Sequence, residues 1–115
     1  MRLLVAGSRD LTDRAQVFRV LDWVHARTLV SVLIQGGARG ADSLAKEWAE
    51  SRGAPVESFP ADWVKHGKRA GPLRNARMLR EGCPDLVVAF SGGRGTEDMV
   101  RQAQAAGVRV IREGC

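Results

Sequence analysis

The sequence predicts an α/β protein with one open, parallel, five-stranded sheet. Short apolar runs rich in Val, Ile and Leu alternate along the chain with segments of helical periodicity. The apolar runs are continuous, which is typical of parallel strands that are covered on both faces. Since crossovers between parallel strands are right-handed, we expect helices on both faces of a Rossmann-like sheet with the strand order 3-2-1-4-5.

Five apolar runs have the length of buried strands. They cover residues 3–6, 29–34, 56–59, 86–90 and 108–111. Between them, apolar residues recur at the spacing of a helix with one buried face. These stripes are Val17, Val20, Leu21 and Val24; Leu44, Ala45, Trp48 and Ala49; and Met99, Val100 and Ala103.

Residues with the chemistry of helix ends lie at the predicted boundaries. Thr12 or Asp13 fits the N-cap of the first helix, and Pro72 fits the first turn of the third. Gly53 and Gly107 stand where the second and fourth helices stop. One connection, residues 60–71, is long, and we expect an irregular loop of the kind that covers a binding site.

Length and composition predict one domain over residues 1–115. No apolar run approaches the roughly 18 residues that cross a bilayer, and the first residues lack the layout of a secretion signal. We therefore expect a cytoplasmic protein without membrane contact. Cys83 and Cys115 have no metal-site or redox spacing, and His25 and His66 have no ligand partners nearby in sequence, so neither metal nor cofactor is expected.

The net charge of +5 and the isoelectric point near 10.2 suit either nucleic acid or a small anionic ligand. The basic residues are not interleaved with an aromatic ladder, and the chain has neither a basic tail nor zinc-finger spacing. Composition therefore favours a small ligand and leaves a nucleic-acid-binding module as an alternative.

Predicted strands end in turns that combine glycine with arginine or hydroxyl side chains. These turns are Gly7-Ser8-Arg9, residues 36–42 (GGARGAD) and residues 91–96 (SGGRGT). Because the carboxyl ends of parallel strands share one edge of the sheet, we expect the turns to converge where the strand order reverses. The last turn leads into a helix, whose free N–H groups and positive end favour a phosphate. The alternative is that the glycines serve only the geometry of the turns.

Two common nucleotide-binding motifs are missing. The pattern GxxxxGK[ST] does not occur, and the first strand is not followed by GxGxxG. The second strand ends in Gln35 rather than in the acidic residue that binds the ribose of NAD, so we do not expect a dehydrogenase.

Four segments together are similar to the YspA/YpsA-related branch of the SLOG superfamily. They are GSRD near the start, QGGARGADSLAKEWA, FPADWVKHGKRAGPLRN and PDLVVAFSGGRGTEDMVRQA, and they cover nearly the whole chain. This superfamily includes the LOG (Lonely Guy) phosphoribohydrolases and the DprA/Smf DNA-processing proteins. The resemblance implies a domain that binds a nucleotide-derived ligand such as a nucleoside phosphate, ADP-ribose or an NAD derivative.

The LOG enzymes, which the chain resembles, cleave the N-glycosidic bond of a nucleotide and carry Arg-Lys-x-x-Met and PGGxGTxxE. Here Arg74 and Met78 match the first motif, with Asn75 in place of the lysine. In the second motif Ser91 replaces the proline and Met99 replaces the glutamate. A carboxylate stabilises the charge that develops on the sugar and methionine does not, so the sequence favours binding over catalysis.

We therefore expect a sensor or carrier of a phosphorylated, nucleotide-derived ligand, with a LOG-like N-glycosidic hydrolase as the alternative. If a bond is cleaved, the catalytic candidates are Arg74, Asp98 and Asp42, with Arg74 as a clamp on phosphate or ribose. A surface ion pair with Asp10 or Asp42 is the alternative role for Arg9 and Arg39. The expected ligand-binding residues are Gly7, Ser8, Arg9, Gly36, Gly37, Ala38, Arg39, Asp42, Arg74, Asn75, Gly92, Gly93, Arg94, Gly95 and Thr96.

Several side chains have two interpretations. Asp42 either caps the second helix or accepts a hydrogen bond from ribose. Trp63 is expected to anchor its loop on the core, with stacking on a base as the alternative. Relatives with this fold commonly form dimers, and Trp23, Val24 and Trp48 are the candidate interface residues for a homodimer.

Overall fold

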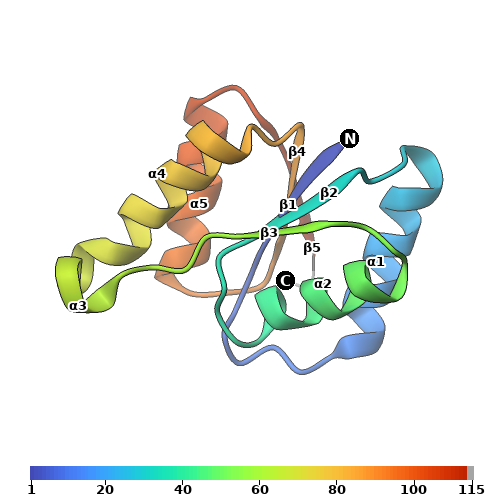
Figure 1. The fold of residues 1–115 in the computed structure, drawn as a ribbon, viewed down its shortest axis with the longest axis horizontal. Helices are drawn as coiled ribbons and strands as arrows, with labels where there is room; N and C mark the ends of the chain where they lie inside the picture. The colour runs from blue at the N-terminus through green and yellow to red at the C-terminus, as the bar shows by residue number, and fades with distance from the viewer. Residues whose placement is uncertain (114–115) are drawn as a thin grey trace.

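The computed structural model describes residues 1–113, which form a five-stranded parallel sheet (Figure 1). The strands are β1 (Arg2–Ala6), β2 (Val32–Gln35), β3 (Val56–Ser58), β4 (Leu86–Phe90) and β5 (Arg109–Glu113). Their order is β3-β2-β1-β4-β5, and each neighbouring pair is parallel. The predicted fold class and strand order are confirmed. β2 begins later than predicted, because Leu29 is exposed in the connection that follows the first helix.

Helices lie on both faces of the sheet, as predicted. They are α1 (Arg14–Arg27), α2 (Ala41–Ser51), α3 (Trp63–His66), the 3₁₀ turn η1 (Gly67–Arg69), α4 (Ala70–Gly82) and α5 (Arg94–Ala105). Figure 1 shows α1 and α2 on one face and α4 and α5 on the other. Leu3 and Val5 of β1 pack in the cluster beneath α1 and α2, whereas Leu4 packs in the cluster beneath α4 and α5. This division follows from the alternation of side chains along a strand.

The helix ends agree with the sequence. Asp13 is the N-cap of α1, and its side chain accepts a hydrogen bond from the Gln16 N–H at 3.0 Å. Pro72 lies in the first turn of α4, and Gly53 and Gly107 follow the ends of α2 and α5. Local capping chemistry therefore fixes the lengths of these helices.

The prediction of an irregular loop over residues 60–71 is wrong. This segment folds into α3 and η1 and leads directly into α4. Asp62 is the N-cap of α3, where its carboxylate accepts a hydrogen bond from the Lys65 N–H at 3.0 Å. A single capping residue before a short helix is a weak signal in sequence, because no long apolar stripe follows it.

The surface predicted for a homodimer is largely core. Trp48 is fully buried and donates from its indole Nε1 to Asp22 Oδ1 at 2.8 Å, and Val24 is also buried. Of the three residues only Trp23 is exposed, so they do not form a shared surface. Cys83 is an exposed free thiol, whereas Cys115 lies outside the described residues. Within residues 1–113, no helix has both the length and the apolar character needed to cross a membrane.

Candidate functional site

The glycine-rich turns after β1, β2 and β4 meet at the carboxyl edge of the sheet, beside the β1–β4 boundary where the strand order reverses. Ser8 links them. Its N–H donates to the Ser91 carbonyl at 2.9 Å, and its own carbonyl accepts from the Ala41 N–H at 3.0 Å. The structure therefore brings the turns together as predicted.

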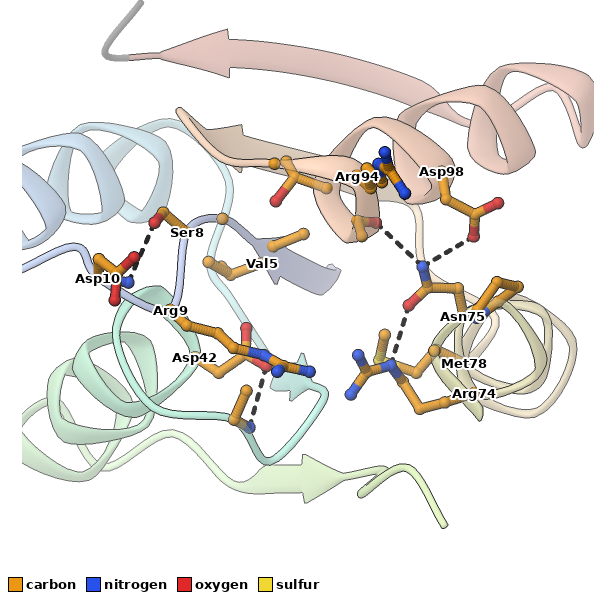
Figure 2. Close-up of a pocket in the computed structure, with 18 of the residues that line it drawn as sticks. Val5, Ser8, Arg9, Asp10, Asp42, Arg74, Asn75, Met78, Arg94 and Asp98 are labelled. Atoms are coloured by element: carbon orange, nitrogen blue, oxygen red, sulfur yellow. Dashed lines mark hydrogen bonds between the residues drawn. The ribbon is translucent and has the colours of Figure 1, made fainter. Parts of the chain in front are cut away.

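A cleft of about 510 Å³ opens at this edge, a volume suited to a small ligand (Figure 2). Most of the predicted binding residues line it, together with the catalytic candidate Asp98. These residues are Gly7, Ser8, Arg9, Ala38, Asp42, Arg74, Asn75, Gly93, Arg94, Gly95, Thr96 and Asp98. The charged side chains of the lining are Arg9, Lys68, Arg74 and Arg94 against Asp10, Asp42 and Asp98. A ligand that carries both an anionic group and hydroxyl groups would match this mixture of charges.

The glycines of the last turn fall into two kinds. A Cβ on Gly92 would lie 2.2 Å from Thr96 Oγ1 and 2.9 Å from the Ser8 nitrogen, so packing of the turns excludes a side chain there. Gly93 and Gly95 also stand at the start of α5 and line the cleft, yet a Cβ on either would meet no described atom within 4 Å beyond its chain neighbours and the backbone of its own helix. Packing of the described chain does not explain these two glycines, whereas close approach of a ligand to the backbone would.

The first turn of α5 presents free N–H groups. The first backbone hydrogen bond of the helix runs from the Glu97 N–H to the Gly93 carbonyl at 3.1 Å, and no side chain within residues 1–113 caps the helix. The N–H groups of Arg94, Gly95 and Thr96 precede this bond and have no partner in the helical ladder. Together with the positive end of the helix dipole, they form an anion-binding geometry beside the cleft.

Arg74 extends from α4 over the turn after β2. Its Nη1 donates to the Gly36 carbonyl at 2.6 Å, an approach that needs glycine because a Cβ on Gly36 would lie 2.3 Å from Nη1. Burial lowers the pKa of Arg74, as does neighbouring Arg9, whereas Asp42 raises it. Arginine nevertheless stays protonated in proteins. In residues 1–113 its Nη2 has no hydrogen-bond acceptor, so this nitrogen can bind a ligand.

Asp42 is buried at the start of α2. Its Oδ2 accepts from the N–H groups of Gly36 at 3.1 Å and Ala38 at 3.2 Å. The interpretation as helix cap is wrong, because Gly40 is the N-cap and Asp42 instead holds the preceding turn. Burial raises the pKa of Asp42, against the opposing effects of the Ala38 N–H and of Arg74. A perturbed carboxyl in a cleft is a common feature of functional sites.

Asn75 connects α4 to the first turn of α5 on one side of the cleft. Its side chain Nδ2 donates to the Gly95 carbonyl at 3.1 Å and to Asp98 Oδ2 at 2.9 Å, while its Oδ1 accepts from Arg74 Nε at 2.9 Å (Figure 2). Asn75 is itself buried. It therefore fixes the first turn of α5 relative to Arg74.

The carboxylate of Asp98 reaches the cleft, whereas Met99 is fully buried in the core. The two side chains point in different directions, as the helical rotation predicts. Besides Asn75, Asp98 accepts hydrogen bonds from Gln102 Nε2 at 2.7 Å and Arg101 Nη2 at 2.8 Å. These donors occupy both carboxylate oxygens.

Arg9 and Trp63 lie together at the cleft. The Arg9 Cζ is 5.0 Å from the centre of the Trp63 ring, and among the described residues the guanidinium has no hydrogen-bond acceptor. Trp63 is 47% exposed, so the interpretation of this residue as a buried anchor is wrong. Figure 2 shows Arg9 and Arg74 pointing toward each other from opposite sides of the cleft.

Comparison with known proteins gives the family. The sequence model described as "YspA, cpYpsA-related SLOG family" matches residues 1–66, which include the turns after β1 and β2. The chain belongs to this SLOG family. The gene 61 protein of Mycobacterium phage D29 is similar to this SLOG chain, with 44% identity over 121 residues that cover 98% of the chain and 96% of the phage protein.

A solved structure supports the fold of this SLOG protein. DNA processing protein A (DprA) from Streptococcus pneumoniae superposes with a TM-score of 0.76 at 19% sequence identity. The match covers 99% of the SLOG chain and 50% of the DprA chain, so the SLOG chain spans half the length of that protein. At this identity the likeness shows a shared fold alone.

The cleft of the SLOG protein differs from the predicted site at several positions. Predicted residues that do not line it are Gly36, Gly37, Arg39 and Gly92. Arg39 instead pairs with Asp10 at 3.3 Å on the surface, with 77% of its side chain exposed, which agrees with the alternative interpretation. Lys68 and Asp10 line the cleft but were not predicted. Lys68 lies in the segment 60–71, which we expected to cover the site. Its place in that segment is the sequence feature that could have identified it as a cleft residue.

Proposed function

We propose that this protein binds a phosphorylated, nucleotide-derived ligand in the cleft and acts as a sensor or carrier of it. The observation that supports this most strongly is the combination at Gly93 and Gly95: both line the cleft, both border free N–H groups, and neither is required to be glycine by packing. In this proposal a phosphate lies on the backbone of residues 93–96.

The two guanidinium groups support the same assignment. Arg9 and Arg74 face one cleft with N–H donors that no residue of 1–113 binds, and each donor is suited to a phosphate oxygen. Arg9 lowers the pKa of Arg74, so the two cations repel each other, although Asp42 raises the pKa of Arg74 and offsets this effect. A bound phosphate would turn this repulsion into two attractions.

Hydrolysis of an N-glycosidic bond is the second candidate, favoured by the position of Asp98 in the cleft. Its oxygens are nevertheless occupied by Asn75, Gln102 and Arg101, and they would have to exchange a partner before they could assist water. Incubation with AMP or NAD, followed by chromatography of the released base, tests this candidate. Release of base at a rate that falls in Asp98→Asn would favour the enzyme over the carrier.

Calorimetric titration with AMP tests the binding proposal. Wild type is expected to bind saturably, and Arg74→Ala to bind about tenfold or more weakly, because it loses a charge-assisted contact. Arg80→Ala, an exposed substitution on the same helix, serves as the control and should bind like wild type. Failure of wild type to bind AMP, ADP-ribose, NAD or inorganic phosphate would contradict the proposal.

A further inference from the structure

Trp63 occupies an unusual position for a large apolar side chain. It lines the cleft and is about half exposed, at the start of the short helix α3 whose first turn is held by Asp62. The ring also lies close to the start of α4, where a Cβ on Gly71 would be 3.5 Å from Trp63 Cη2. The indole is therefore positioned by its surroundings while a large part of its surface faces solvent and the cleft.

The contact on the Trp63 ring is made by a group that is free to leave. Arg9 lies over the ring at 5.0 Å from its centre, and in the described part of the chain no acceptor binds its N–H groups. A cation over an exposed aromatic ring contributes only about 0.5–1 kcal/mol. Arg9 also experiences the like charge of Arg74, so an anion in the cleft would attract it away from the ring.

We propose that Trp63 is the stacking platform for the aromatic base of the ligand, and that Arg9 leaves the ring to bind the ligand's phosphate. The inference rests on the proposed function and adds to it the group that selects a nucleotide over a sugar phosphate. A flat base fits the ring face that the flat guanidinium covers, and exposed indole surface would be removed from water. Pro72 also lines the cleft, one residue after Gly71, which lies close to the ring.

Trp23 provides a matched control for Trp63. It is 51% exposed, and the Arg27 guanidinium lies over its ring at 3.7 Å, so it has similar exposure and a similar cation contact. Trp23 does not line the cleft. Substitution of Trp23 therefore reproduces the loss of an exposed, arginine-covered indole without touching the proposed site.

The experiment compares AMP with ribose 5-phosphate, which has the same sugar and phosphate but no base, by calorimetric titration of wild type, Trp63→Ala, Trp63→Phe and Trp23→Ala. Wild type is expected to bind AMP about tenfold or more tightly than ribose 5-phosphate. Trp63→Ala should lose about 5- to 100-fold in AMP affinity and leave ribose 5-phosphate affinity unchanged within about twofold. Trp63→Phe should retain the preference for AMP, and Trp23→Ala should match wild type.

Several outcomes would overturn the inference. Equal binding of AMP and ribose 5-phosphate by wild type would reject the base platform while leaving the phosphate site intact. An equal loss of affinity for AMP and for ribose 5-phosphate in Trp63→Ala would show that the ring only maintains the structure of the cleft. Binding of neither compound, with no binding of inorganic phosphate, would reject the proposed function itself. Binding of a single-stranded oligonucleotide without binding of AMP would assign the ring to a nucleic-acid surface instead.

Discussion

Gly95 occupies the first turn of α5, where alanine would be the better helix former. Nothing in the described chain would touch a Cβ at this position. The glycine therefore lowers helix stability without a packing gain, and in the proposed site the close approach of a phosphate to its N–H group would be the physical reason for its presence. The variant Gly95→Ala separates the effect of this residue on helix stability from its effect on ligand binding.

We expect Gly95→Ala to raise the free energy of unfolding by up to about 1 kcal/mol, because alanine restricts the unfolded chain. The same change should weaken AMP binding about tenfold or more, since the methyl group would keep the phosphate from the backbone. Urea denaturation and calorimetric titration measure the two effects. Gln104→Ala, an exposed change on the same helix, should leave AMP affinity unaltered, and wild-type affinity in Gly95→Ala would contradict the site.

Asp42 predicts a dependence of stability on pH. Because burial raises its pKa, the folded protein binds the proton more tightly than the unfolded chain, whose aspartate has a pKa of about 3.9. The stability that Asp42 contributes is thus fully present below about pH 3.9 and is lost as the pH rises through the higher folded value. Asp42→Asn carries no such proton.

The free energy of unfolding of Asp42→Asn minus that of wild type should therefore increase as the pH rises from about 4 toward neutrality. Urea denaturation of both proteins at a series of pH values provides the measurement. Taking the difference between the two free energies of unfolding cancels the contributions of the other carboxyl groups, which both proteins share. A difference for Asp42→Asn that falls with pH would show that hydrogen bonds from Gly36 and Ala38 outweigh burial.

Individual residues also show what could not be predicted from the sequence. Glycine and arginine after a strand predicted the position of Arg9 and Arg39 at the sheet edge, but not the direction of either side chain. Arg9 turns to the cleft and Arg39 turns to Asp10 on the surface, and this choice depends on tertiary contacts that the spacing does not encode. Trp63 was misassigned for the same reason.

At the scale of elements, the α4–α5 pair forms one wall of the cleft, and the buried Asn75 holds it together. Removing the amide leaves Asp98 without one donor, the Gly95 carbonyl without its side-chain donor and Arg74 Nε without an acceptor. Buried polar groups that lose their partners destabilise the folded state.

Asn75→Ala is expected to lower the free energy of unfolding by about 1–3 kcal/mol and to weaken AMP binding, because the first turn of α5 loses its link to Arg74. Arg101→Ala removes a different donor to Asp98, from a side chain that is 71% exposed, and should change stability by less than about 0.5–1 kcal/mol. Urea denaturation of both variants tests the pair. Equal effects in the two variants would mean that the buried amide is not what joins the helices.

Strands and long helices were predictable because their apolar patterns are local. The run at 86–90 was located without error, and the stripes of α2 and α5 were correctly assigned to the core. The short helix α3 was not predictable from periodicity, since four residues complete barely one turn. Its cap at Asp62 was the local signal that could have corrected the prediction.

For the whole molecule, the net charge of +5 makes some attraction to nucleic acid unavoidable, and salt separates this from a specific site. We expect oligonucleotide binding to be weak and to fall steeply as salt rises from about 50 to 200 mM, whereas AMP, with one phosphate, should lose far less affinity. Fluorescence anisotropy with a labelled oligonucleotide and calorimetry with AMP provide the two curves. Tight oligonucleotide binding that survives high salt and is not displaced by AMP would instead favour the nucleic-acid module.

The central claim is that the N–H groups at the start of α5, together with Arg9 and Arg74, bind a phosphate. The most direct measurement is a two-dimensional ¹H–¹⁵N NMR titration of the protein with AMP. The proposed site predicts saturable shifts of the backbone N–H signals of Arg94, Gly95 and Thr96 with one common dissociation constant. Unchanged signals for these residues, or shifts spread over exposed arginines and lysines without saturation, would contradict it.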